Sequence, residues 1–184
     1  MAETPSTMLP LGTLAAQFKL LDTISNQFLT LDELKSDKAT VIMFICNHCP
    51  YVRHILDTLI DVVKNYQPKG IHFIAINSNN VQKYPADSPD KMKILAKEHD
   101  FTFPYLFDET QDIAKKYQAA CTPDFYIFDK NLKCVYRGRF DESTPGNDAP
   151  VTGNELTAAL DNILANQPVS ENQKPSVGCN IKWK

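Results

Sequence analysis

The stretch at residues 41–51, VIMFICNHCPY, decides the fold. Its first five residues are apolar without interruption, which is the pattern of a strand buried on both faces of a sheet. Two cysteines follow at once, Cys46 and Cys49, with His48 between them. The pair therefore lies where a central strand ends, and any chemistry that it carries is expected at that edge of the sheet.

A helix and a second buried strand are predicted downstream of the cysteine pair. Residues 71–77, IHFIAIN, form another near-continuous apolar run, and Gly70 marks the end of the helix before it. A β-α-β unit is the expected result. The apolar positions that recur at helical spacing between the two strands are Tyr51, Ile55, Leu59, Val62 and Val63.

Three more segments carry clear signals. Ser88 and Pro89 are typical of the start of a helix, and a short helix is expected from Glu109 or Thr110 to about Tyr117. Residues 125–128 read as a buried strand that forms a hairpin with residues 134–140. The spacing Thr152-x-x-Glu155 predicts a capping box at the start of a last helix. That helix would carry one apolar face, made of Leu156, Leu160, Ile163 and Leu164.

This order of elements predicts an α/β fold with a mixed central sheet and helices on both sides. A chain of 184 residues with 43% hydrophobic and 22% charged residues fits a single domain. We expect one domain over residues 1–184, with a core at about 11–168 and an irregular C-terminal tail at 169–184.

Charge and hydropathy exclude some partners. The formal net charge is −3 and the lysines are scattered, so nothing indicates binding to nucleic acid or to an anionic membrane. The N-terminus has no basic region followed by an apolar stretch, and no apolar segment approaches the length of a membrane span. A cytoplasmic protein is therefore predicted, and the sequence does not indicate its oligomeric state.

Five cysteines at irregular spacings do not resemble the paired framework of a small secreted domain. In a reducing compartment, a close pair more often binds metal or performs redox chemistry than stabilises a fold. Cys121 and Cys134 are expected to pack in the core, since free cysteine is among the most buried residue types. Cys179, in the tail, is a candidate additional thiol that could reach the close pair or a second subunit.

The position of the close pair predicts different roles for its two thiols. If a helix opens directly after Cys46, with Asn47 as its N-cap, backbone N–H groups and the helix dipole stabilise a Cys46 thiolate. A protonated His48 would lower the pKa of this thiol further. Cys49, one turn into the helix, is shielded and suits a resolving thiol.

A second stretch, CTPD at residues 121–124, precedes the strand at 125–128. Cys-x-x-Cys after a central strand together with Thr-Pro before a hairpin resembles the thioredoxin superfamily. The resemblance implies a cis proline at Pro123, and it implies that Thr122 and Pro123 support the active site. It also implies an N-terminal β extension and a helical insertion. Several stretches are similar to its peroxiredoxin-like AhpC/TSA branch: AQFxL with LxxL, FICNHCPYV, NSNNVQKYPADSPDKM, FPYLFDET, CTPDFYIFD and PSVGCNIKW.

The chain departs from the patterns of both groups. If Cys49 is placed on the reactive cysteine of the peroxiredoxin motif P-x-x-x-T-x-x-C, Cys46 stands at the threonine and Ile42 at the proline. No arginine occurs near Pro123. The acid that thioredoxins carry about six residues before the first cysteine is replaced by Thr40. The histidine between the cysteines is similar to that of protein disulfide isomerases, and it implies fast thiol–disulfide exchange.

These observations predict a thiol–disulfide oxidoreductase with a redox-active disulfide and no other cofactor. Cys46 would attack, Cys49 would resolve, and the loop at Thr122 and Pro123 would hold the substrate strand by main-chain pairing. The expected partners are disulfide-containing proteins or low-molecular-weight thiols, and a thiol reductant that recycles the pair. A thiol peroxidase is the second hypothesis. A non-enzymatic zinc or partner-binding module is the third, although no second pair of zinc ligands accompanies the cysteines in sequence and no metal is expected.

Overall fold

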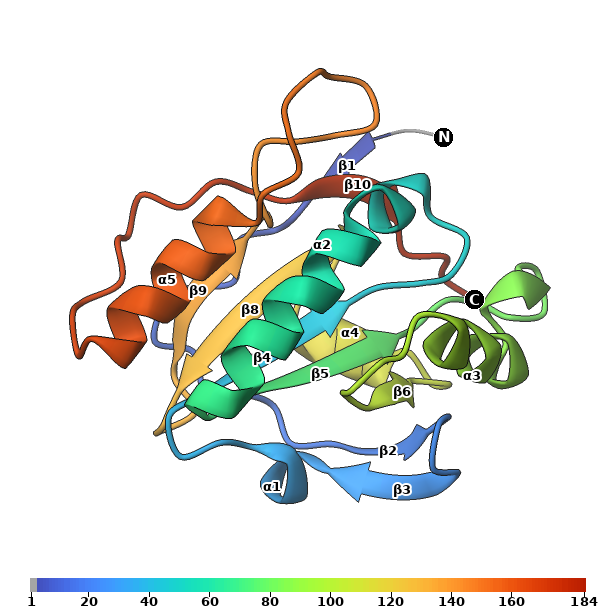
Figure 1. Cartoon of the computed structure of the whole chain (residues 1–184). Helices are drawn as coiled ribbons and strands as arrows, with labels where there is room; N and C mark the ends of the chain where they lie inside the picture. Colours follow the sequence, from blue (N-terminus) through green and yellow to red (C-terminus); the bar gives the residue numbers. More distant parts are fainter. Residues whose placement is uncertain (1–2) are drawn as a thin grey trace.

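The structure is a computed structural model that describes residues 3–184 (Figure 1). A seven-stranded mixed sheet runs through the middle of the molecule, and this confirms the predicted α/β class. Its strands, in spatial order, are β3 (Gln27–Thr30), β2 (Lys19–Asp22), β6 (Tyr105–Phe107), β5 (Ile71–Asn77), β4 (Ala39–Phe44), β8 (Asp124–Asp129) and β9 (Cys134–Gly138).

The predicted β-α-β unit forms the centre of this sheet. All six residues of β4 are buried, with β5 parallel on one side and β8 antiparallel on the other. Helix α2 (Pro50–Tyr66) connects β4 to β5. The predicted hairpin between β8 and β9 is also present. Because β4 ends at Phe44 and α2 begins at Pro50, the two cysteines lie in the connection between them.

Helices cover both faces of the sheet (Figure 1). Side chains of β4 alternate between the two layers: Val41 and Met43 belong to one apolar cluster, and Ile42 and Phe44 belong to the other. The cluster of Val41 also holds buried side chains of α2, α3 (Pro89–Glu98) and α5 (Asn154–Leu164). The opposite cluster holds those of α1 (Leu31–Leu34) and α4 (Asp112–Lys116).

A separate three-stranded sheet corrects the expectation of an irregular tail. Strand β10 (Val177–Asn180) lies between β1 (Glu3–Pro5) and β7 (Cys121–Thr122), and it is antiparallel to both. Figure 1 shows β1 and β10 side by side, beyond the N-terminal end of α2. The sequence of the tail lacks the alternating pattern that predicts a strand. The strand forms because β1 and β7, which are distant in the sequence, supply its hydrogen-bonding partners.

The predicted capping box at the last helix is wrong. Gly153 is the N-cap of α5, in the left-handed conformation with φ of 64°, and the helix begins at Asn154. The N–H groups of Thr152 and Gly153 donate to the carboxylate of Asp141. The carboxylate of Glu155 instead pairs with the guanidinium of Arg139 at 2.6 Å. Tertiary partners have therefore replaced the local pair that the spacing indicated.

The segment between β5 and β8 also differs in detail. Helix α3 has Ser88 as its N-cap and Pro89 as its first residue, as predicted. The short helix α4 is only five residues long, and the carboxylate of Asp108 accepts hydrogen bonds from the N–H groups of Ile113 and Ala114 in its first turn. Strand β6 lies within this segment and was not predicted. A turn of 3-10 helix, η2 (Pro85–Asp87), precedes α3.

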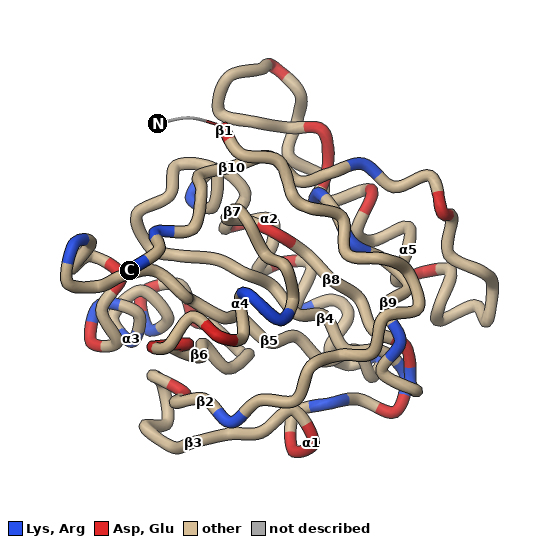
Figure 2. Tube along the Cα trace, turned by 180° about the vertical axis from the view of Figure 1, so that it is seen from behind, with Lys and Arg blue, Asp and Glu red and all other residues tan. Residues whose placement is uncertain are grey.

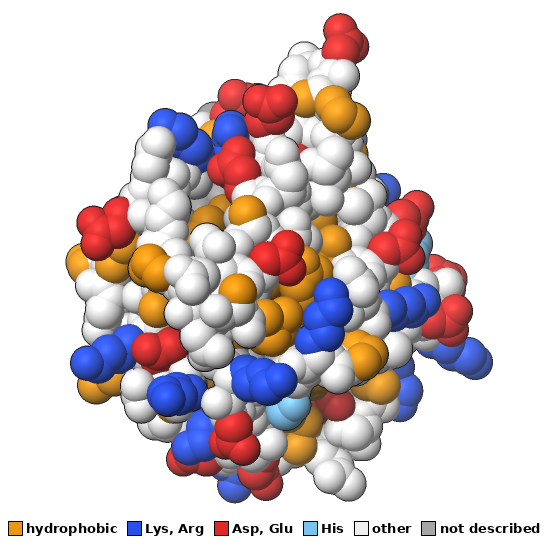
Figure 3. Space-filling model, turned by 60° about the vertical axis from the view of Figure 1, so that its left-hand side comes forward, with side chains coloured by type: hydrophobic (Ala, Val, Ile, Leu, Met, Phe, Trp, Pro, Cys, Tyr) orange, Lys and Arg blue, Asp and Glu red, His pale blue; other side chains and the backbone are white. Residues whose placement is uncertain are grey.

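Charged residues of both signs are interspersed along the chain (Figure 2) and on the face of the molecule drawn in Figure 3. This distribution agrees with the scattered charges of the sequence. Within residues 3–184, no helix combines the length and the apolar character that crossing a membrane requires.

Candidate functional site

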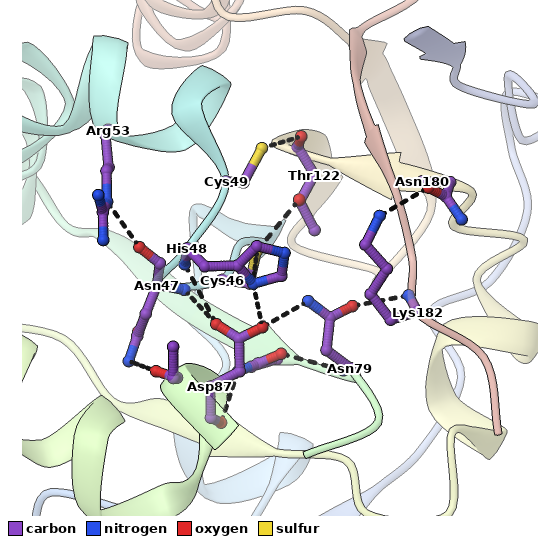
Figure 4. Close-up of polar contacts among 12 residues, drawn as sticks. Cys46, Asn47, His48, Cys49, Arg53, Asn79, Asp87, Thr122, Asn180 and Lys182 are labelled. Carbon is purple, nitrogen blue, oxygen red and sulfur yellow. Dashed lines mark hydrogen bonds and ion pairs between the residues drawn. The ribbon is translucent and has the colours of Figure 1, made fainter. Parts of the chain in front are cut away.

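Cys46 and Cys49 meet beside Thr122. The two thiols lie close enough to shift each other's pKa, and both sulfurs contact the same threonine. The Sγ of Cys46 lies 3.4 Å from Thr122 Oγ1, and the Sγ of Cys49 lies 3.2 Å from the Thr122 carbonyl oxygen (Figure 4). The peptide bond between Thr122 and Pro123 is cis. The structure therefore brings together the four residues of the two sequence motifs.

The N-terminus of α2 faces Cys49 rather than Cys46. Cys49 is the N-cap of the helix, and although its side chain makes no cap hydrogen bond, the backbone N–H of Val52 helps to lower the pKa of its thiol. This corrects the prediction that Asn47 caps the helix and that Cys49 lies one turn inside it. The correction matters because the stabilising field of a helix N-terminus acts mainly on groups within its first turn.

Asp87 accepts hydrogen bonds from the N–H groups that were expected to stabilise a Cys46 thiolate. Its Oδ1 accepts hydrogen bonds from the N–H of Asn47 at 2.8 Å and from the N–H of His48 at 3.2 Å. The Asp87 side chain is fully buried and comes from η2. The anion bound by the loop between the cysteines is thus a carboxylate of the protein itself.

His48 lies between Cys46 and Asp87 (Figure 4). Its Nδ1 donates to Asp87 Oδ2 at 2.5 Å and lies 3.9 Å from Cys46 Sγ. Asn79 donates to the same carboxylate oxygen at 2.8 Å, and the ring of Tyr84 stacks on the imidazole with 5.2 Å between centroids. The imidazole is therefore held from one edge and one face. Its Nε2 is buried and has no hydrogen-bond partner in the described chain.

These contacts shift the pKa values of the two thiols in opposite directions. The hydrogen bond with Cys49, burial and the negative Asp87 carboxylate together raise the pKa of Cys46. The S–H of Cys46 lowers the pKa of Cys49, although burial opposes this, and further help comes from the Cys179 thiol, Thr122 and the Val52 N–H. These contacts favour a thiolate on Cys49 and a protonated Cys46. The sequence predicted the opposite roles, with Cys46 as the activated thiol.

Both cysteines are covered. Cys46 is 1% exposed and Cys49 is 0% exposed, so the shielding that was expected for Cys49 alone applies to both. Part of the cover is β10, which pairs with Cys121 and Thr122 through its residues Asn180 and Cys179. A substrate strand could not pair with Thr122 as the sequence suggested unless β10 first moved away.

The arrangement also contains atoms that could hold a metal ion. Cys46 Sγ, a ring nitrogen of His48 and an oxygen of Asp87 all lie within 4.8 Å of one another. The sequence offered no second ligand pair, but the fold supplies Asp87 from a distant segment. Zinc would need to replace the proton shared by His48 and Asp87, because their 2.5 Å contact is a direct hydrogen bond.

Several residues of the site were not predicted from the sequence. Asp87, Asn79 and Tyr84 lie in NSNNVQKYPADSPDKM, which was singled out only for its resemblance to the family. Three polar side chains that stay buried, at Asn77, Asn79 and Asp87, were the available signal, but their burial becomes visible only in the fold. On α2, Arg53 is exposed and His54 is half-buried. The Nε of Arg53 donates to the Asn47 carbonyl at 2.9 Å, and the Nε2 of His54 is buried without a partner.

Comparison with known proteins places the chain in a family. The AhpC/TSA family model matches residues 11–137, and the chain belongs to the AhpC/TSA family. This confirms the family resemblance that its motifs indicated. A comparison with functionally curated proteins finds no match.

Solved structures confirm the thioredoxin-like fold. An uncharacterised conserved protein from Geobacillus kaustophilus is 56% identical with a TM-score of 0.99, and the match covers 100% of this chain and 97% of that one. A hypothetical protein from Sinorhizobium meliloti 1021 is 42% identical with a TM-score of 0.95, covering 98% of each chain. A putative protein disulfide isomerase from Bacteroides thetaiotaomicron is 19% identical with a TM-score of 0.67, covering 88% and 94%, and it is similar in fold alone.

Proposed function

We propose that this protein is a thiol–disulfide oxidoreductase whose redox centre is the Cys46–Cys49 pair. The observation that carries the proposal is the contact of both sulfurs with Thr122 at the N-terminus of α2, where the pKa of Cys49 is lowered. A thiolate is the nucleophile of disulfide exchange, and a neighbouring thiol within bonding reach is what resolves a mixed disulfide. No cofactor other than the disulfide is needed for this chemistry.

The electrostatics favour Cys49 as the attacking sulfur. Its thiolate attacks one sulfur of a substrate disulfide, the S–S bond breaks, and the leaving thiolate takes up a proton. The sulfur of Cys46 then loses its proton and attacks Cys49 Sγ, which expels the second substrate thiol and leaves a Cys46–Cys49 disulfide. An external thiol reductant restores the dithiol. Because every step is reversible, the same site could also oxidise a substrate dithiol.

His48 and Asp87 are positioning residues in this proposal. Asp87 holds the backbone of the loop between the cysteines, and its hydrogen bond fixes the imidazole next to Cys46 Sγ. The Nδ1–H of the imidazole is donated to Asp87, so the ring fixes the geometry beside Cys46, and the Cys46 proton passes to the departing substrate thiolate when the mixed disulfide is resolved. The substrates we propose are disulfides of proteins or of low-molecular-weight thiols, in a reducing, cytoplasmic compartment.

The test uses two serine variants and a glutathione-based disulfide reporter. Cys46→Ser should trap a glutathione adduct on Cys49 at least transiently, and Cys49→Ser should form no adduct at the site, with turnover lost in Cys49→Ser and reduced in Cys46→Ser. If trapping occurs in Cys49→Ser instead, Cys46 is the nucleophile and the order of the two steps is reversed. If both variants turn over like the wild-type protein, the proposed function is wrong. Cys134→Ser is the control, since its thiol lies in the opposite apolar cluster and donates to the Tyr136 carbonyl.

A thiol peroxidase is the second candidate, and one observation favours it. A buried thiolate at a helix N-terminus suits attack on the small O–O bond of a peroxide, which would yield a sulfenic acid that Cys46 converts to the disulfide. The guanidinium of Arg53, however, is engaged by the Asn47 carbonyl rather than aimed at a sulfur. Peroxide consumption coupled to a thiol reductant decides between the two: a rate no higher than that of free cysteine excludes the peroxidase.

A zinc-binding module would give a different result from either enzyme. Stoichiometric zinc in the purified protein, with thiols that react with an alkylating reagent only after chelation, would favour a role for Cys46, His48 and Asp87 as ligands.

A further inference from the structure

Strand β10 carries a third cysteine to the redox pair. In the register between β10 and β7, Cys179 lies directly opposite Thr122, the residue that contacts both sulfurs of the pair. The fit between the two strands is close, because a Cβ added to Gly178 would lie 2.0 Å from the Thr122 carbonyl oxygen. The backbone therefore holds Cys179 at a fixed place beside the dithiol.

The side chain of Cys179 points into the site rather than into solvent. It is 2% exposed, and it packs in the same apolar cluster as Cys46 and Cys49. The Cys179 thiol lowers the pKa of Cys49, and Cys49 raises that of Cys179, so the two sulfurs lie within reach of each other's charge. Cys49 thus has two cysteines in its cluster besides itself, one from its own loop and one from β10.

Cys121 and Cys134 do not share this position. Cys121 is buried, and its Sγ lies 3.8 Å from the Pro123 carbonyl oxygen, which holds its thiol on the far side of the loop. Cys134 lies in the apolar cluster on the other face of the sheet, and its thiol contacts the Tyr136 carbonyl oxygen at 3.4 Å. Within residues 3–184, Cys179 is the cysteine outside the Cys-x-x-Cys motif that shares its apolar cluster and lies opposite Thr122.

We propose that Cys179 is a third redox-active thiol of this site, and that Cys49 exchanges its disulfide partner between Cys46 and Cys179. This inference rests on the proposed function, because it needs a Cys49 that forms disulfides. Starting from the Cys46–Cys49 disulfide, the Cys179 thiol loses its proton and its sulfur attacks Cys49 Sγ. The Cys46–Cys49 bond breaks, a Cys49–Cys179 bond forms, and Cys46 leaves and takes up a proton. One disulfide is exchanged for another, so the exchange consumes no oxidant or reductant.

The exchange gives the site a property that a simple dithiol lacks. When Cys49 is bonded to Cys179, the Cys46 thiol is free beside His48 while the protein is still oxidised. A disulfide between α2 and β10 would also fix the strand that covers the site, whereas the reduced strand is held by hydrogen bonds and packing alone. The redox state of Cys179 therefore controls whether the cover over the pair can open.

The experiment removes Cys46, so that Cys179 is the partner left to Cys49. The Cys46→Ser protein is treated with a limiting amount of oxidised glutathione, quenched in acid and mapped by peptide mass spectrometry. We expect an internal Cys49–Cys179 disulfide, and decay of the Cys49–glutathione adduct about tenfold or more faster than in Cys46→Ser/Cys179→Ser. Cys46→Ser/Cys134→Ser is the matched control and should behave like Cys46→Ser.

Two outcomes overturn the inference. One is an adduct on Cys49 that persists equally with and without Cys179. The other is a wild-type protein whose singly oxidised form contains the Cys46–Cys49 pairing and no Cys49–Cys179 pairing after acid quenching; this second measurement does not depend on any variant folding. If the wild-type protein forms neither pairing under the same conditions, the proposed function has failed as well. If it forms Cys46–Cys49 alone, only the role of Cys179 is lost.

Discussion

The Nδ1 of His48 lies 2.5 Å from Oδ2 of Asp87, and the same carboxylate accepts the backbone N–H groups of Asn47 and His48 through its other oxygen. One buried side chain thus fixes both the backbone of the loop between the cysteines and the ring beside Cys46. Burial by itself raises the pKa of Asp87, but hydrogen bonds from His48, Asn79 and Asn47 outweigh it and lower the pKa below its ordinary value.

Asp87→Asn should therefore destabilise the protein at neutral pH and weaken its response to acid. A carboxyl whose pKa is lower in the folded state contributes stability above its unfolded pKa of about 3.9, and this stability is lost as the pH falls. We expect a loss of about 1–3 kcal/mol at neutral pH, which shrinks as the solution is acidified. Urea unfolding at several pH values measures both. Asp90→Asn, an exposed acid of α3, is the control, and equal losses at neutral and acidic pH would contradict the prediction.

The reduced protein should contain one thiolate well below the pH at which a free cysteine ionises, about 8.5. The cause is the hydrogen bond from Cys46 to the Cys49 sulfur, opposed by burial and reinforced by Cys179, Thr122 and Val52, which lowers the pKa of Cys49. Ultraviolet thiolate absorbance, followed against pH, measures this titration. The low-pH transition should disappear in Cys49→Ser and persist in Cys134→Ser. If it disappears in Cys46→Ser but persists in Cys49→Ser, the thiolate is Cys46 and the assignment to Cys49 is wrong.

Asp124 should give the stability of the protein the opposite dependence on pH. It directly follows Pro123, is completely buried, and has one carboxylate oxygen without a hydrogen-bond partner in the described chain. Burial raises the pKa of Asp124 to about 8, although hydrogen bonds from Tyr126 and the Phe125 backbone work in the other direction. The folded state then keeps a proton that the unfolded state releases.

Stability linked to Asp124 is full below the unfolded pKa of about 3.9 and is lost as the pH rises through the folded pKa. Asp124→Asn should gain in stability relative to the wild-type protein between weakly acidic and weakly alkaline pH, because the asparagine carries no proton to lose. Denaturant midpoints over this range test it. Asp148→Asn, at an exposed position, should keep the wild-type slope. If the denaturant midpoint of Asp124→Asn changes with pH in the same way as that of the wild-type protein, Asp124 is ionised in the folded state.

Gly178→Ala should loosen β10. The added Cβ would lie 2.0 Å from the carbonyl oxygen of Thr122, so the two strands must separate to accept it. We expect a loss of about 1–3 kcal/mol, seen as a lower thermal midpoint, and faster alkylation of Cys179. In Gly146→Ala, the matched control, the added Cβ meets only Thr144 Oγ1 at 3.9 Å. Unchanged stability and alkylation in Gly178→Ala would mean that β10 is not held as closely as its register indicates.

Local patterns were sufficient for the central elements of the fold. The apolar runs at residues 41–45 and 71–77 predicted β4 and β5, and the helical spacing between them predicted α2. Strand β4 is buried throughout and β5 is buried except at His72, so the composition of these strands reflects their environment directly. Predictions failed where a side chain from elsewhere decides the structure, as when Asp141 takes the N–H groups of Thr152 and Gly153.

The candidate site shows the same division. Cys46, Cys49, Thr122 and Pro123 were found because each lies in a short motif, and the structure brings all four together. The different character of the two thiols could not be predicted, because it depends on Asp87, which lies about forty residues away in sequence in a segment with no periodic pattern. Cys179 was only a candidate, since the strand that carries it has no local signal.

The pairing of β10 with β1 and β7 has a consequence for the order in which the molecule assembles. Glu3 and Cys179 are register partners from the two extremes of the printed sequence, and closing so long a loop costs more conformational entropy than any contact within the β-α-β unit. The β-α-β unit of the central sheet can form from neighbouring segments, whereas the cover over the cysteines needs strands that are far apart in the sequence. During folding, the Cys46–Cys49 pair is therefore exposed and reactive before Cys179 arrives, so an early oxidation would select the pairing within the motif.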